Sequence, residues 1–158
     1  MDMGERERST GRRALGSVVL ALLTTAGQVM EPPCALACAC ESQRSPRQEL
    51  ESADAVFTGV VTRVQRFEKT RQNMNRMTVT QIYVVHFTPK RIWKGPRQGS
   101  IQVEAPDPEY DDCGIDFTSG EEYLVYAAGG DKLTTDRCHR TKAASQAAED
   151  LSALGEPR

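Results

Sequence analysis

The sequence has 158 residues, with 20 Lys and Arg, 22 Asp and Glu, and a formal net charge of −2 at pH 7. This length admits one domain with additional segments, and the slight negative charge argues against a nucleic-acid-binding protein. The sequence contains no nucleophile elbow, phosphate loop or paired-acid motif, and its two histidines are His86 and His139. We therefore do not expect an enzyme or a bound cofactor.

The first 37 residues have the three parts of a secretory signal. Four arginines lie among the first 13 residues, a mostly apolar run covers residues 14–30, and Ala35-Leu36-Ala37 forms a small-x-small cleavage pattern. The apolar run is short for a membrane anchor. We therefore expect residues 1–37 to be removed as a signal peptide, leaving residues 38–158 as a secreted, soluble domain and a monomer.

Two alternative export routes give a periplasmic or lipid-anchored protein instead. Lipidation at Cys34 or Cys38 would make the chain a lipoprotein, but such signals have Leu three residues before the cysteine, where Cys38 has Ala35. A Glu-Pro-Pro run precedes Cys34, and it also fits poorly. Arg12-Arg13 matches a twin-arginine signal only weakly.

The cysteine count is consistent with export. Cleavage after Ala37 removes Cys34 and leaves four cysteines, and an even number in an exported chain indicates a disulfide framework. These four are Cys38, Cys40, Cys113 and Cys138. Four cysteines allow three pairings, and the first two are too close in sequence for easy bridging, so each is expected to bond a distant partner.

A zinc site is the alternative use of these cysteines, with His86 or His139 as a further ligand. Cys-x-Cys followed by two widely spaced single cysteines is not a standard zinc spacing. The disulfide interpretation is therefore preferred.

The first elements of the domain are a short helix and a strand. Residues 45–52 predict a helix because Ser45 is a good cap and Gln48 completes a capping box. Residues 55–64 predict a strand rich in β-branched side chains. Gly59 within that strand indicates a bulge or a tight bend.

The middle of the chain predicts a hairpin followed by a short strand. Residues 66–76 are polar and charged and predict a mobile hairpin loop. Residues 77–93 predict a long strand, in which Pro89 bends or ends the pairing. After a turn at residues 94–96, residues 100–104 predict a short strand.

Two charged groups in this region are candidate ligand sites, although a solvated loop is the preferred interpretation of each. The acidic residues of the 105–112 loop are candidate calcium ligands, but their spacing does not match the known calcium loop. The basic residues of the hairpin are candidates for contact with polyanions. The acidic group is Asp107, Glu109, Asp111 and Asp112, and the basic group is Arg63, Arg66, Lys69, Arg71 and Arg76.

The end of the chain predicts a buried strand over 123–127, a turn at Gly129-Gly130, a last strand over 132–137 and a helix over 141–154. Five strands, one of them long and bent, with helices near both ends, favour an all-β domain with flanking helices. A five-stranded Greek-key barrel of the OB type fits best. Periodicity alone does not separate it from a β-sandwich.

Six short motifs, in order and spacing, resemble the N-terminal netrin-like domain of the tissue inhibitors of metalloproteinases, of which the chain would be a short single-domain relative. The motifs are Cys-Ala-Cys at 38–40, Asp-Ala-Val-Phe-Thr-Gly at 54–59, Trp-Lys-Gly at 93–95, Cys-Gly at 113–114, Glu-Glu-Tyr-Leu-Val-Tyr at 121–126 and Thr-Thr-Asp-Arg-Cys at 134–138. The resemblance implies an OB-type barrel and two disulfides, Cys38–Cys113 and Cys40–Cys138.

The resemblance also implies a function, which is inhibition of a zinc metalloendopeptidase. In that family the α-amine and the backbone carbonyl oxygen of the first residue chelate the catalytic zinc of the protease, and here that residue is Cys38. Ala39 is then expected to point toward the specificity pocket of the protease, and Cys40 and Glu41 to continue along its cleft.

Two features differ from the family. No cysteine lies between residues 41 and 112, so a third disulfide is missing, and Ala39 stands where Thr or Ser is common. Ala39 should fill a protease pocket less well. Two alternatives follow: the Cys-Ala-Cys segment serves only to attach an N-terminal strip to the barrel, or the chain is a non-inhibitory secreted binding module.

Overall fold

The computed structural model describes residues 38–40, 44–73 and 76–157. The expected signal segment, Cys34 and Glu41 lie outside these residues. Among the residues that the structure describes, no helix is long and apolar enough to cross a membrane.

Helix α1 covers Pro46–Ser52, as the capping pattern predicts. The Ser45 hydroxyl accepts a hydrogen bond from the Gln48 backbone N–H (3.3 Å), and the Gln48 side chain accepts one from the Ser45 backbone N–H (2.9 Å). These two bonds satisfy donors that have no partner inside the helix.

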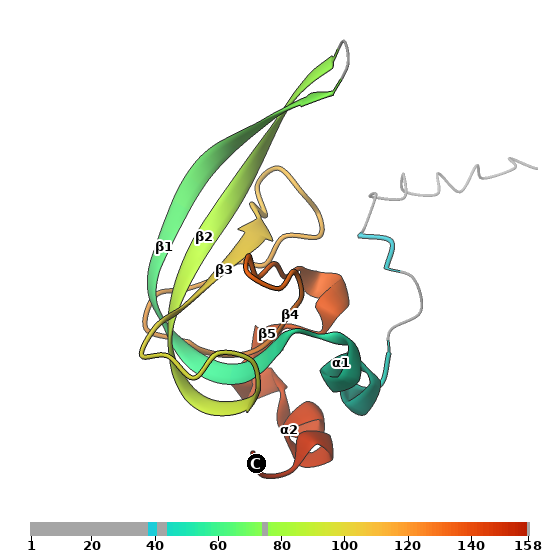
Figure 1. Ribbon diagram of the computed structural model, residues 1–158, viewed down its shortest axis with the longest axis vertical. Helices are drawn as coiled ribbons and strands as arrows, with labels where there is room; N and C mark the ends of the chain where they lie inside the picture. The colour runs from blue at the N-terminus through green and yellow to red at the C-terminus, as the bar shows by residue number, and fades with distance from the viewer. Residues whose placement is uncertain (1–37, 41–43, 74–75, 158) are drawn as a thin grey trace, which may run out of the picture. The chain divides into compact units, whose positions relative to one another are not determined.

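The domain is built on one five-stranded antiparallel sheet with the strand order β3-β2-β1-β4-β5 (Figure 1). The sequence-based expectation of a β-rich domain is therefore confirmed. The strands are β1 (Ala55–Asn73), β2 (Arg76–Lys94), β3 (Ile101–Pro106), β4 (Glu122–Ala127) and β5 (Lys142–Ala143). Helix α2 covers Ala148–Leu154.

The predicted hairpin loop over residues 66–76 is wrong, because β1 and β2 remain paired from Val56 opposite Lys94 to Asn73 opposite Arg76. The hairpin extends beyond the other strands of the sheet (Figure 1). Its charged residues Arg66, Glu68 and Lys69 are exposed and do not oppose pairing. The Gln81 side chain, for example, donates a hydrogen bond to Glu68 on the neighbouring strand (3.2 Å).

The predicted bend near Gly59 is present as a set of register shifts in the β1–β2 ladder, one of them between Thr58 and Gly59. Gly59 pairs with Pro89, and a Cβ at Gly59 would lie 3.1 Å from the Thr88 carbonyl oxygen. Any side chain at Gly59 would therefore require the Thr88 carbonyl or the Phe57 ring to shift by a few tenths of an ångström.

Side chains alternate along β1 and β4 between two apolar clusters. Phe57 and Val125 belong to the larger cluster on one face of the sheet, whereas Val56 and Leu124 belong to the smaller cluster beneath α1 and α2. Both faces of these central strands are buried, which explains the continuous apolar run in β4. The smaller cluster also contains Ala53, Tyr126 and Ala147, with Leu50, Trp93, Leu151 and Leu154 packed against it.

Two predictions near the C-terminus are wrong. Residues 132–137 do not form a strand: Thr134 makes single bridges to Glu104 and to Ala128, and a 3₁₀ turn follows at Arg137–His139. The predicted helix over 141–154 is confined to α2, because Lys142 and Ala143 pair with β4 instead.

The predicted surface loop over 105–112 also differs, because Asp107 is completely buried. The Arg66 guanidinium lies 2.6 Å from Asp107 Oδ2 and 2.9 Å from a Glu109 oxygen, and it donates to the Tyr83 hydroxyl (3.1 Å). Asp107 Oδ1 accepts the Glu109 backbone N–H. This ion-pair cluster explains the burial without a metal ion.

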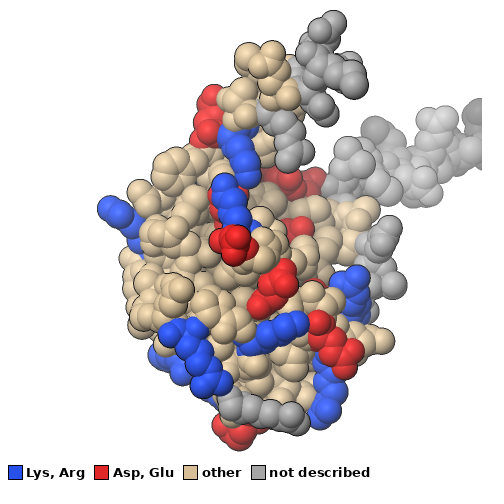
Figure 2. Space-filling view, in the orientation of Figure 1, with Lys and Arg blue, Asp and Glu red and all other residues tan. Residues whose placement is uncertain are grey.

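Two members of the basic group of the hairpin form ion pairs with acidic residues. Arg66 is paired as described, and Lys69 lies 3.1 Å from a Glu104 oxygen. On the face shown in Figure 2, acidic and basic side chains are interspersed. This arrangement gives no support to a polyanion-binding patch on that face.

A buried carboxylate, Asp150, connects α2 to the rest of the domain. Arg140 donates to both of its oxygens (2.8 and 2.9 Å), Lys142 donates to Oδ2 (3.1 Å) and the Tyr126 hydroxyl donates to Oδ1 (3.3 Å). Burial alone would raise the pKa of Asp150. The hydrogen bonds from Arg140 and Lys142 outweigh that effect, so the pKa lies below its usual value.

Asp150→Asn should lower the free energy of unfolding by about 3 kcal/mol, because it leaves a mostly buried guanidinium without its counter-charge. Glu149→Gln, on the exposed face of the same helix, is the matched control and should change it by less than about 0.5 kcal/mol. Urea unfolding at pH 7 measures both. Because the folded-state pKa of Asp150 is depressed, the difference should persist above about pH 4 and shrink as the pH falls through that pKa. Equal effects of the two substitutions would contradict this account.

Candidate functional site

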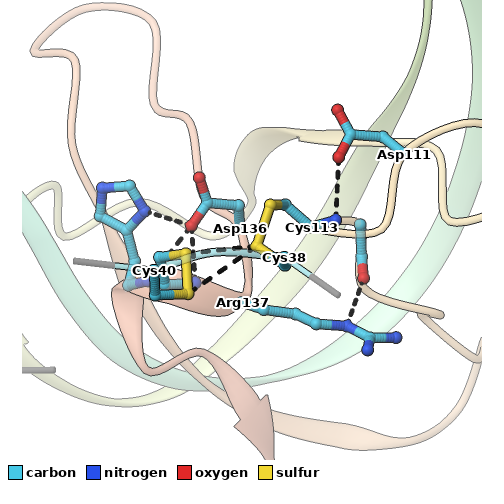
Figure 3. Close-up of a disulfide and its surroundings, with 9 residues drawn as sticks. Cys38, Cys40, Asp111, Cys113, Asp136 and Arg137 are labelled. Carbon is cyan, nitrogen blue, oxygen red and sulfur yellow. Dashed lines mark hydrogen bonds and ion pairs between the residues drawn. A yellow bond between two sulfur atoms is a disulfide. The ribbon is translucent and has the colours of Figure 1, made fainter. Parts of the chain in front are cut away.

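The Cys38-Ala39-Cys40 segment is held against the domain by two disulfides, Cys38–Cys113 and Cys40–Cys138 (Figure 3). These are the pairings that the resemblance implies. They close loops with sequence separations of 75 and 98 residues. In the chain-entropy model each contributes roughly 4 kcal/mol of stability.

Within the segment, the Cys40 backbone N–H donates to the Cys38 carbonyl oxygen (3.0 Å). This tight turn directs both cysteine side chains toward the domain. Ala39 lies between them and is exposed, whereas Cys38 and Cys40 are half-buried.

The loops that receive the disulfides are held together by hydrogen bonds of their own. The Arg137 backbone N–H donates to the Cys113 carbonyl (3.0 Å), and the Arg137 side chain donates to the Gly114 carbonyl (2.6 Å). Asp111 accepts the Cys113 N–H (2.8 Å) (Figure 3). A Cβ at Gly114 would lie 2.6 Å from the Pro108 nitrogen, so only glycine fits this approach.

Asp136 organises the turn that contains Cys138. Its Oδ1 accepts the backbone N–H of Cys138 (2.8 Å) and of His139 (3.2 Å), and it lies 2.8 Å from the His139 ring nitrogen Nδ1. The hydrogen bond to Asp136 raises the pKa of His139. Burial opposes the ionised form of Asp136, but the interactions with His139 and the two N–H groups lower its pKa overall.

An open cavity of about 510 Å³ lies beside this turn, between the hairpin, β3 and the 134–139 segment. Its lining includes Lys69, Thr80, Ile82, Glu104, Asp136 and His139. The sequence analysis did not identify this cavity, because three separate segments contribute its walls.

The structure brings together three of the four residues expected at the protease-binding edge, namely Cys38, Ala39 and Cys40, while Glu41 lies outside the described residues. It does not support the mixed zinc site with His86. The group of possible metal ligands among the described residues consists of cysteine sulfurs, which are oxidised here. His86 instead contacts the side chains of Gln65 (3.2 Å) and Gln102 (3.4 Å).

Comparison with protein-family models and with curated proteins gives no match to this chain. Any assignment of function therefore depends on the residues and geometry described above.

The Asp136–His139 pair predicts a pH-dependent contribution to stability. His139 titrates near 6.5 in the unfolded chain and higher in the folded protein. The contribution is therefore complete below about pH 6.5 and is lost as the pH rises through the folded-state pKa. Wild type should lose its stability advantage over His139→Gln as the pH rises above about 6.5, as measured by thermal unfolding at each pH.

NMR titration of the imidazole provides an independent check of this pair. Asp136→Asn retains an oxygen that caps the turn but removes the charge, so the pKa of His139 should return toward its usual value. An unchanged imidazole pKa in this variant would show that Asp136 is not the cause of the shift.

Proposed function

We propose that the chain is a secreted inhibitor of zinc metalloendopeptidases, similar to the N-terminal netrin-like domain of the tissue inhibitors of metalloproteinases. The observation that carries the proposal is the attachment of the Cys38–Cys40 segment by a disulfide at each of its cysteines. These bonds fix the candidate new N-terminus, which the signal-cleavage pattern places directly before Cys38.

The proposal includes closure of the sheet into a five-stranded OB-type Greek-key barrel. Its support is the segment around Thr134, which bridges the edge strand β3 and Ala128, the residue that follows β4. The Glu104 N–H donates to the Leu133 carbonyl (2.9 Å), and the Thr135 N–H donates to the Glu104 carbonyl (2.9 Å). On the other side, Thr134 and Ala128 exchange two backbone hydrogen bonds (2.7 and 3.0 Å).

Removal of residues 1–37 would convert the Cys38 nitrogen from an amide into a free α-amine. A catalytic zinc has three protein ligands and one open position that normally holds water. The amine nitrogen and the carbonyl oxygen of one residue would form a five-membered chelate and displace that water. An α-amine titrates at about pH 8, so zinc readily displaces its proton at neutral pH.

The disulfides reduce the entropic cost of docking. A free N-terminus would lose conformational freedom on entering a cleft, whereas a segment with two covalent attachments has lost most of it already. The Cys38 carbonyl oxygen accepts the Cys40 N–H, and its second lone pair serves the zinc. Ala39, exposed between the bridges, is the side chain that would enter the specificity pocket.

A non-inhibitory secreted binding module of the same fold is the second candidate. The observation that favours it is the turn within the segment, where the Cys40 N–H occupies part of the acceptor capacity of the Cys38 carbonyl. The segment would then act only as a structural attachment. Partner binding in that case does not depend on the α-amine.

The decisive comparison uses the exported protein that begins at Cys38 and a version with one additional alanine before it. The extension removes the chelating amine, so inhibition of a zinc endopeptidase should weaken by at least ~100-fold, because loss of a group that only supports a metal ligand already costs ~10–100-fold. Glu149→Gln, remote from the segment, is the control and should inhibit like wild type. Equal inhibition by the extended and unextended proteins would contradict the chelation mechanism.

The same preparation distinguishes the second candidate. If the proteins with a free and an acetylated Cys38 amine retain a binding partner equally in a pull-down, the protein is a binding module.

Ala39→Thr should strengthen inhibition by about tenfold, because a larger side chain fills more of an apolar pocket. Ala39 is exposed, so its replacement should leave the unfolding midpoint unchanged. The inhibition constants and melting temperatures of the two proteins test this expectation. No gain in affinity would mean that the residue 39 side chain does not enter a pocket.

A further inference from the structure

The sulfur atoms of the four cysteines in residues 38–158 gather at one place. Cys38 Sγ lies 3.3 Å from Cys138 Sγ and 3.8 Å from Cys40 Sγ, although these belong to different disulfides. The sulfurs of Cys38, Cys113 and Cys138 all lie within 4.8 Å of one another. In a tetrahedral zinc site with Zn–S bonds of about 2.3 Å, the sulfurs are about 3.8 Å apart.

We propose that these four cysteines, when both disulfides are reduced, form a tetrathiolate site for one Zn²⁺ ion. The inference is independent of the inhibitor proposal, in which backbone atoms of Cys38 contact zinc that belongs to another protein. Here the side chains bind the ion within the chain itself. Zinc suits the site because thiolates are among its preferred ligands and a closed set of four is a structural site.

The chemistry requires a reductant, which we specify as a dithiol. Each disulfide accepts two electrons and two protons, and each dithiol is oxidised to a cyclic disulfide. Zinc binding then displaces the four thiol protons, so affinity should rise with pH.

The non-covalent contacts around the sulfurs keep the site together after reduction. Cys113 and Cys138 lie on loops joined by the Arg137 N–H to the Cys113 carbonyl (3.0 Å). The Asp111 and Asp136 side chains accept hydrogen bonds from the backbone N–H groups of Cys113 and Cys138, respectively (2.8 Å each). None of these bonds involves a sulfur atom, so two of the four ligands remain in place.

The other two ligands are brought together by the local turn. The Cys40 N–H bond to the Cys38 carbonyl places both side chains on one side of the strip. To reach tetrahedral spacing, the two sulfurs of each former disulfide must move apart, and the 3.3 Å between Cys38 Sγ and Cys138 Sγ must increase slightly, whereas Cys38 and Cys40 already have that spacing (3.8 Å). His139 is not a ligand in this proposal, because four thiolates already complete the tetrahedral coordination of zinc.

The test uses the full chain with Cys34→Ser, so that the fifth cysteine takes no part. The protein is reduced with excess dithiol, freed of reductant under argon and titrated with Zn²⁺ alone. We expect one Zn²⁺ per chain after gel filtration, and a higher melting temperature than the reduced, metal-free chain. Co²⁺ should give the absorption spectrum of a tetrahedral thiolate complex. The oxidised chain should bind neither ion.

Two sets of variants assign the ligands. Cys40→Ser and Cys138→Ser should each lower the affinity for Zn²⁺ by more than ~100-fold, whereas His139→Ala should bind like the parent. Failure of the reduced chain to bind stoichiometric zinc, folded or unfolded, would overturn the proposal. So would equal binding by the oxidised chain, or a loss in His139→Ala as large as that in the cysteine variants.

Discussion

The covalent attachment of residues 38–40 is the constraint on which the candidate site depends. A tripeptide has too little surface to hold itself against a sheet, since ordering each residue costs about 1–2 kcal/mol of backbone entropy. The two disulfides from positions 38 and 40 supply the attachment that the small surface of the tripeptide cannot provide. They bond to Cys113 and Cys138, whose loops are linked to each other by hydrogen bonds from Arg137. Residues 38–40 are therefore attached to a single connected part of the domain.

Local patterns in the sequence predicted the elements whose stability is local. The capping box of α1 and the apolar run of β4 depend on neighbouring residues, and both were found as expected. The end of the β1–β2 hairpin was predicted as a loop because its sequence is highly charged. Its stability comes from pairing between the two strands, which a local sequence pattern does not show. Thr134, within residues 132–137, forms a local bridge to Ala128 and a long-range bridge to Glu104, and no short-range pattern reveals the second.

The candidate site was only partly predictable for the same reason. The cysteine count predicted disulfides, but their pairing came from a resemblance and not from spacing. The burial of Asp107 was missed because its partner, Arg66, is 41 positions earlier in the chain, on the hairpin. The closeness of all four sulfurs likewise arises from the meeting of three distant segments, which sequence spacing does not encode.

The long β1–β2 arm has a consequence for self-association. Among the described residues, β1 beyond Val60 and β2 before Ile82 pair with each other and with no third strand, so the outer edges of the hairpin are open, and open edges can template aggregation. Its lysine, arginine and glutamate side chains make edge-to-edge stacking of two molecules costly. The same charged residues that made this segment resemble a loop in the sequence therefore oppose aggregation. They allow the exposed β1–β2 hairpin to remain monomeric at high protein concentration.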